Sequence, residues 1–114
     1  MVCDSIRNPI RHLSGGNQQK VLLARWLAAA PSILLLNDPS RGVDHHTKAT
    51  MHEVYRRIAS TGAMVILLSS EIEELLAVAD STVVFHERTV QEVLPRDQMT
   101  RSSLLRAMFA TAAA

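Results

Sequence analysis

Cysteine is nearly absent from this sequence, and so are the features of a secreted or membrane-spanning protein. The 114 residues include one cysteine, Cys3, which can form no internal disulfide and belongs to no metal or redox motif. No apolar run follows Met1, so we expect no secretory signal. The apolar region 21–36 is interrupted by Arg25 and Pro31 and predicts two elements rather than a membrane span. We therefore expect a reducing, cytoplasmic setting without direct membrane insertion.

Glycine and lysine are also scarce, which bears on nucleotide binding. A phosphate-cradling P-loop requires the pattern Gly-x-x-x-x-Gly-Lys-Ser/Thr. None of the four glycines precedes a lysine, and the two lysines, Lys20 and Lys48, fall in helical patterns. Without this loop there is neither a backbone cradle for the α- and β-phosphates nor a lysine for the β- and γ-phosphates. We expect that these residues alone do not make a self-sufficient ATPase.

The sequence also has no large excess of positive or negative charge. Twelve Lys and Arg balance eleven Asp and Glu, which leaves a formal net charge of +1. Nucleic-acid binding normally needs a basic surface, so we expect no nucleic-acid partner. Gln18, Gln19, Lys20 and Arg25 on one predicted helix remain as the basis of an alternative, a helix-turn-helix DNA binder.

The apolar pattern predicts the order helix, strand, helix, strand, helix, strand, strand, helix. The expected helices are 14–30, 45–60, 70–79 and one that contains 104–109, and the expected strands are 33–36, 64–68, 82–85 and 89–94. This alternation predicts an α/β layer fold with a mainly parallel sheet flanked by helices. Because strands 33–36 and 64–68 are apolar throughout, we expect both to be buried on both faces.

Four side chains in these elements carry local predictions. Asp44 precedes the second helix and is expected to be its N-cap. Ser70 is followed three residues later by Glu73, the pattern of a capping box. Trp26 lies on the apolar side of the first helix, so we expect it to face the core.

The segment Leu13–Lys20, LSGGNQQK, is the most specific in the chain. A serine and two glycines, Ser14, Gly15 and Gly16, come directly before a long helical pattern. The first N–H groups of a helix lack intrahelical partners, and the helix dipole places partial positive charge there. Such a start is suited to an anion. The alternative is an ordinary serine-capped helix.

Three motifs in this order resemble the C-terminal part of an ABC-transporter nucleotide-binding domain. They are LSGGNQQKVLLARWLA (Leu13–Ala28), LLLNDPSRGVD (Leu34–Asp44) and VILLSSEIEELLAVAD (Val65–Asp80). They are most similar to the second ATP-binding cassette of bacterial monosaccharide importers of the ribose, galactose and xylose type. The resemblance implies a partial P-loop NTPase fold that lacks the N-terminal P-loop portion.

The resemblance also divides the chain. It implies an irregular lead-in at 1–12, the C-terminal part of an ABC ATPase domain at 13–96, and a C-terminal helix with an alanine-rich tail at 97–114. The signature loop of that domain corresponds to Ser14, Gly15, Gly16 and Asn17. In such transporters this loop contacts the γ-phosphate of ATP held by the opposite cassette of a dimer.

Asn37 and Asp38 stand where the family usually has Asp-Glu at the end of a buried strand. The first carboxylate normally holds Mg²⁺ and the second positions the attacking water. An amide at position 37 carries no negative charge, so this Mg²⁺ position is degenerate. Asp38 retains a carboxylate on a shorter side chain, which makes it a weak substitute for the catalytic Glu. A purely structural role for both as strand-end turn residues is the alternative.

Three further positions match or depart from the family. Asp44 matches the acidic residue of a loop that crosses the dimer interface, a role compatible with helix capping. Ser70 stands at the switch position, where most ABC ATPases have histidine and second cassettes of sugar importers often have serine. Arg88 replaces a glycine between two strands, which puts the geometry of that turn in question.

The implied function is that of an ATP-binding subunit fragment of a monosaccharide importer. It would supply the signature side of an ATP site at a cassette dimer interface and bind ATP and Mg²⁺ only with a P-loop-bearing partner cassette. A membrane permease subunit would hold it at the inner face of the cell membrane. The alternative is a degenerate, non-hydrolysing cassette that acts as a structural or regulatory partner, so enzymatic activity stays open.

Overall fold

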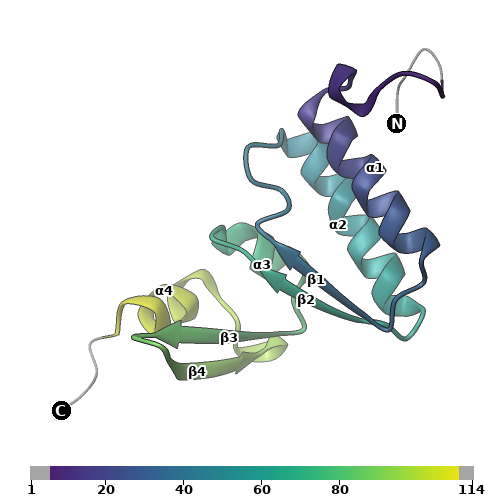
Figure 1. Ribbon diagram of the computed structural model, residues 1–114. Helices are drawn as coiled ribbons and strands as arrows, with labels where there is room; N and C mark the ends of the chain where they lie inside the picture. The colour runs from purple at the N-terminus through teal and green to yellow at the C-terminus, as the bar shows by residue number, and fades with distance from the viewer. Residues whose placement is uncertain (1–5, 111–114) are drawn as a thin grey trace. The chain divides into compact units, whose positions relative to one another are not determined.

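The computed structural model describes residues 6–110, which form two compact units, one ending at Leu68 and the other beginning at Ser69 (Figure 1). The elements, in chain order, are η1 (Ile10–His12), α1 (Gly15–Ala28), β1 (Ile33–Asn37), α2 (His45–Ser60), β2 (Met64–Leu68), α3 (Ile72–Val78), β3 (Ser81–His86), β4 (Thr89–Pro95), η2 (Arg96–Gln98) and α4 (Arg101–Phe109). The predicted order of helices and strands is confirmed. The structure adds two single 3-10 turns, one of them inside the segment expected to be irregular.

The first unit is a parallel strand pair with two helices. β1 and β2 pair in register from Ile33 opposite Met64 to Asn37 opposite Leu68. The chain crosses between them through α2, which is the connection that parallel strands require. α1 contacts α2, and the buried side chains come from both helices and from β1. These buried apolar side chains are Leu23, Leu34, Leu36, Met51, Tyr55 and Ile58.

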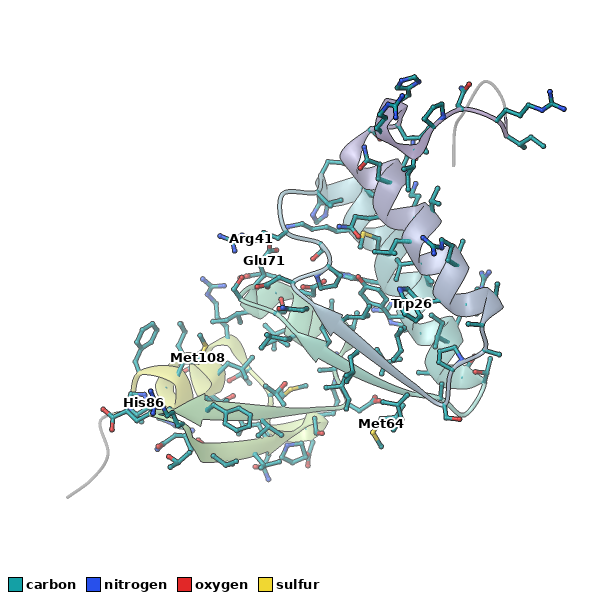
Figure 2. The ribbon with its side chains drawn as sticks, in the orientation of Figure 1. Trp26, Arg41, Met64, Glu71, His86 and Met108 are labelled. Atoms are coloured by element: carbon teal, nitrogen blue, oxygen red, sulfur yellow. The ribbon has the colours of Figure 1, made fainter. Side chains whose placement is uncertain are left out.

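The other face of this small sheet is exposed, which corrects the prediction of strands buried on both faces. Leu35 is 71% exposed, and Met64 points away from α1 and α2 (Figure 2). The exposed apolar side chains of this face are Ile33, Leu35, Met64, Ile66 and Leu68. A parallel sheet is normally covered on both faces. The first unit itself supplies helices for one face only.

Trp26 is another correction, because 49% of it is exposed. The core contact of α1 is made by Leu23, which is 3% exposed. The other large apolar side chains of α1, Leu22 and Leu27, are also exposed. The helical periodicity correctly predicts an apolar side of α1, of which Leu23 is buried while Trp26 and Leu27 are exposed.

The second unit is an antiparallel hairpin with two helices. β3 and β4 pair from Ser81 opposite Pro95 to His86 opposite Thr89, with an irregularity between Val84 and Phe85. This sheet is therefore separate from the parallel pair and of the other type. Its core gathers side chains from α3, both strands, the link between η2 and α4, and α4 itself, namely Ile72, Val84, Leu94, Met99, Leu104 and Ala107.

The last helix is amphipathic as predicted, but not all of its predicted apolar side is buried. Leu104 is fully buried, whereas Phe109, in the last turn, is 74% exposed. Thr100 caps α4 in a capping box with Ser103. None of the helices within residues 6–110 has the length and apolar composition that crossing a membrane demands.

The hairpin turn forms without glycine. Glu87 and Arg88 have φ angles of +49° and +67°, and two residues with positive φ are what a type I′ turn requires. A side chain in this left-handed region crowds its own carbonyl group, at a cost on the order of 1 kcal/mol per residue. The tight turn between β3 and β4 therefore forms although Arg88 stands in place of glycine, and its backbone is strained.

Replacing Arg88 with glycine is expected to stabilise the protein by about 0.5–1 kcal/mol, because glycine adopts positive φ without that crowding. Urea unfolding of Arg88→Gly measures the change. Arg88→Ala is the matched control, since it also removes the guanidinium group but keeps a Cβ atom. Equal free energies of unfolding for the two variants would contradict the strain.

Candidate functional site

The first helix begins as its sequence predicts. Ser14 is the N-cap in extended conformation, and its Oγ accepts a hydrogen bond from the Asn17 amide at 3.2 Å. The Gln18 amide donates to the Ser14 carbonyl at 2.9 Å, and the Gln18 side chain donates to the Leu13 carbonyl at 2.9 Å. The residues before the helix are therefore linked to its first turn by two side-chain hydrogen bonds, one from each of Ser14 and Gln18.

This helix start is open to a ligand. Ser14 and Gly15 are exposed, and a Cβ atom added at Gly15 would meet no atom within 4 Å. The first N–H groups of a helix point outward along its axis and have no partner inside the helix. An anionic group can therefore approach the backbone at Gly15 closely, in the field of a helix of 14 residues.

Asn37 and Asp38 lie where β1 ends. Asn37 is the last residue of the strand, opposite Leu68, and is exposed. The Asp38 amide donates to the Leu68 carbonyl at 2.8 Å, which carries the pairing one step past the strand. Asp38 itself has a φ of +43°, and its carbonyl accepts from the Arg41 amide at 3.3 Å. Aspartate is among the residues that tolerate this conformation best.

The turn after Asp38 is held by burial and by a backbone hydrogen bond. Ser40 is 1% exposed and its carbonyl accepts from the Val43 amide at 3.1 Å. This geometry accounts for Asn37 and Asp38 as strand-end residues and leaves the Asp38 carboxylate partly exposed beyond the strand. The sequence signal that could have found the positive φ is the run of turn-forming residues from Asp38 to Gly42.

A magnesium site does not follow from these residues alone. Mg²⁺ prefers carboxylate oxygens in near-octahedral geometry. Within residues 6–110 there is no group of three or more His, Cys, Asp or Glu side chains that could hold a metal ion. Asn37 offers only a neutral amide oxygen, so the side chains present here do not fit a complete Mg²⁺ shell.

Asp44 caps α2 with both carboxylate oxygens. Oδ1 accepts from the Thr47 amide at 2.9 Å, and Oδ2 accepts from the Thr47 hydroxyl at 2.7 Å. The backbone bond from Thr47, followed by its hydroxyl bond, lowers the pKa of Asp44 below the usual value of 3.8. The prediction that Asp44 caps this helix is confirmed.

The lowered pKa of Asp44 predicts an acid-dependent part of the stability. The ionised carboxylate stabilises the fold fully above its unfolded-state pKa, and this contribution is lost as the pH falls through the lower folded-state pKa. Asp44→Asn keeps a capping oxygen but does not titrate. We expect the stability difference between the wild type and Asp44→Asn to change only below about pH 4. Thermal unfolding of both proteins from about pH 7 down to about pH 3 measures it; parallel curves would contradict the prediction.

A small hollow connects α1 with the end of β1. Its volume is about 190 Å³, and its wall includes Gln19, Leu22 and Trp26 from α1 and Leu35 and Asp38 from β1 and its end. Asn37 also lines this hollow. Sequence reasoning did not place Gln19 or Trp26 beside Asn37 and Asp38, because the packing of a helix on a strand is not visible in either motif.

The structure brings the candidate residues of the first unit to one end of it. Figure 1 shows that α1 and α2 run in the same direction and opposite to β1 and β2. The helix starts, at Ser14 and Asp44, therefore lie at the end toward which the strands run. Asn37 and Asp38 follow the carboxyl end of β1. Open α/β sheets bind ligands at this end of their strands.

Ser70 belongs to the second unit and does not form the predicted capping box. The N-cap of α3 is Glu71, which makes no side-chain capping bond. The neighbouring Ser69 makes the local contacts instead: its Oγ donates to Glu74 Oε2 at 2.5 Å and accepts from the Glu71 amide at 3.1 Å. Sequence reasoning missed Ser69 and Glu74, because Ser69-to-Glu74 spacing is not a recognised capping pattern.

Known proteins similar to this chain are ATP-binding proteins of sugar importers. The ribose import ATP-binding protein RbsA 2 of Streptomyces avermitilis is 42% identical over 96% of this chain and 22% of its own length. RbsA of Geobacillus kaustophilus is 44% identical over 87% of this chain and 20% of its own length. The D-allose import ATP-binding protein AlsA of Escherichia coli is 38% identical over 90% of this chain and 20% of its own length. This chain thus spans about a fifth of the length of these relatives.

Solved structures agree on the fold. A metal-chelate type ABC transporter in an inward-facing conformation superposes with a TM-score of 0.73 at 22% identity, over 88% of this chain and 40% of that one. An ATP-binding cassette of another ABC transporter gives a TM-score of 0.70 at 16% identity, over 80% of this chain and 36% of that one. No protein-family profile matches the sequence. The chain is therefore related in sequence to a segment of the ATP-binding proteins of bacterial sugar importers, and it has the fold of part of an ABC ATP-binding cassette.

Proposed function

We propose that this chain supplies the signature side of an ATP site in a bacterial monosaccharide importer, and that a P-loop-bearing cassette supplies the other side. The observation that carries the proposal is the start of α1. Ser14 caps a 14-residue helix, Gly15 is open to solvent, and the segment LSGGNQ resembles the signature motif of ABC cassettes. These residues suit the terminal phosphate of a nucleotide held from the opposite side.

Each group at this helix start has a defined part in the proposal. The amides at Gly15 and Gly16 donate to phosphate oxygens, and the Ser14 hydroxyl, which accepts from the Asn17 amide, keeps its own hydrogen to donate outward. Asn17 is held in the first turn by that bond. Asp44, at the start of the neighbouring helix α2, lies on the same end of the unit and faces the partner cassette.

The catalytic part of the proposal concerns Asp38 and Ser70. Asp38 stands in place of the glutamate with which the family positions the attacking water and is a weak substitute for it. Ser70 stands at the switch position, which contacts the terminal phosphate. ATP and Mg²⁺ bind only in the pair, because the P-loop and the remaining ligands come from the partner. When bound, Mg²⁺ would neutralise charge on the phosphates; Asn37 contributes at most one neutral oxygen to it.

The exposed apolar face of the β1–β2 sheet supports the need for a partner. Five large apolar side chains on one face of this sheet are exposed. Parallel sheets are normally covered on both faces. The relatives are about five times as long as this chain and have room for the missing cover. We propose that the assembly also contacts a membrane permease subunit and acts at the cytoplasmic face of the membrane.

Equilibrium binding of labelled ATP tests this function. The chain alone is expected to show no Mg²⁺-dependent binding at micromolar ATP, since it lacks a P-loop. Adding the chain to a P-loop-bearing cassette of a sugar importer should tighten ATP binding beyond that of the cassette alone. That cassette carries an Asp in place of its own signature serine, so that its homodimers cannot close on ATP. Tight binding by the chain alone would refute the proposal, and so would no gain from the partner.

A second candidate function is favoured by Asn37 and Asp38. A neutral amide and a short carboxylate in a strained turn suit a degenerate cassette that pairs with a partner without hydrolysing ATP. In that case the pair binds ATP as above but turns it over no faster than the partner cassette alone. Measuring binding and hydrolysis in the same samples separates the two functions.

A further inference from the structure

Ser70 lies between Ser69 and Glu71, and the Ser69 hydroxyl joins these two residues and also bonds to Glu74. Ser69 Oγ accepts from the Glu71 amide at 3.1 Å and donates to Glu74 Oε2 at 2.5 Å. Glu71 lies beside the first turn of α3 (Figure 2), and Ser70 is exposed just before it. The backbone on either side of Ser70 is therefore anchored through Ser69.

The acceptor of the Ser69 hydroxyl, Glu74, is a buried acid. Glu74 is 3% exposed, in the first turn of a helix whose neighbouring Ile72 belongs to the core. Burying a carboxyl group is unfavourable unless it is hydrogen-bonded. An acid at this position thus provides an acceptor for the Ser69 hydroxyl that an apolar residue of the same size would not provide.

We propose that Glu74 is a positioning residue for Ser70: through the Ser69 hydroxyl it fixes the loop that presents Ser70 to the terminal phosphate of ATP. This proposal rests on the proposed function for its last step, the contact of Ser70 with phosphate. The first step, the coupling of Glu74 to the loop through Ser69, can be measured in the chain by itself.

Amide hydrogen exchange in the full chain tests the coupling. In Glu74→Ala the Ser70 and Glu71 amides should exchange about five- to tenfold faster, as expected for the loss of one anchoring hydrogen bond. Ser69→Ala should do the same, and the double variant should be no faster than Ser69→Ala, because both changes break one chain of contacts. Glu74→Gln is the matched control: its amide oxygen can still accept from Ser69, so exchange stays near that of the wild type.

Protection of amides in β3 and β4 reports whether the unit is still folded. Additive effects in the double variant, or unchanged exchange at Ser70 and Glu71 in Glu74→Ala, would overturn the proposal. If Glu74→Ala loses the protection of β3 and β4, the comparison of Ser69→Ala with Glu74→Gln decides, since neither change removes buried volume. Fast exchange confined to the loop in Ser69→Ala supports the coupling; wild-type exchange there overturns it.

The second step is measured as the preference for ATP over ADP in the pair with a P-loop-bearing cassette. Glu74→Ala should lower this preference about tenfold, and it should add nothing in a Ser70→Ala background. A loss in Ser70→Ala without one in Glu74→Ala overturns positioning toward phosphate. If neither variant changes the preference while the exchange result holds, the coupling stands and the role proposed for Ser70 fails.

Discussion

Replacing Ser14 with aspartate is expected to weaken ATP binding by the reconstituted pair by about 100-fold or more while leaving the helix intact. Aspartate caps a helix as well as serine does, so α1 should keep its N-cap bond to the Asn17 amide. The new carboxylate, however, would lie at the helix start where the terminal phosphate is proposed to bind. Two like charges in close contact without solvent between them repel strongly.

Ser14→Asn is the matched control for this substitution. Asparagine caps as well as aspartate but is neutral, and it lacks the hydroxyl, so we expect a loss of about tenfold. Circular dichroism and thermal unfolding of both variants verify that the first unit is folded. Equal binding by Ser14→Asp and the wild type would show that no phosphate reaches the start of α1.

The double substitution Asn37→Asp with Asp38→Glu is expected to raise ATP hydrolysis by the pair about 100-fold. The first change supplies a charged ligand for Mg²⁺, and the second returns a methylene length to the group that positions water. A shift of about 1 Å in a catalytic group can account for a rate change of that size. Steady-state phosphate release from the pair measures the gain.

The single variants separate chemistry from backbone strain. Asp38 has a φ of +43°, which glutamate tolerates less well than aspartate, so Asp38→Glu alone should lower the free energy of unfolding by about 1 kcal/mol. Asn37 lies in regular strand conformation, so Asn37→Asp should leave the free energy of unfolding nearly unchanged. Hydrolysis that stays at the level of the wild-type pair in the double variant would count against a degenerate site at Asn37 and Asp38.

Helix starts were predictable from sequence because their hydrogen bonds are local. Ser14 and Asp44 both bond to an amide three residues on; Asp44 was predicted as an N-cap, and capping was one of the two roles considered for Ser14. The start of α3 was not predictable in the same way. Two adjacent serines precede it, and the Ser69 hydroxyl bonds to Glu74, whose burial the local pattern does not predict.

The strands were predictable in position but not in burial. The apolar run that contains Leu35 predicts a strand covered on both faces, yet Leu35 is 71% exposed. Such a run records the environment of a complete sheet, and the described residues contribute two parallel strands with helices on one side. Trp26 likewise was predicted to face the core from the apolar side of α1, yet it is 49% exposed while Leu23 on that side is buried.

The backbone of the candidate site was the least predictable part. The positive φ of Asp38 arises where its amide continues the β1–β2 pairing to the Leu68 carbonyl, a contact between residues 30 positions apart. The turn at Glu87 and Arg88 likewise takes its conformation from the pairing of β3 with β4, against the local preference of both residues.

The measurement that tests the central claim most directly is the position of the terminal phosphate in a crystal structure of this chain paired with a P-loop-bearing cassette and a non-hydrolysable ATP analogue. The account predicts γ-phosphate oxygens at hydrogen-bonding distance, about 3 Å, from the Ser14 hydroxyl and the Gly15 or Gly16 amide, with the other phosphates held by the partner. A nucleotide enclosed elsewhere, with no contact to the start of α1, would contradict it.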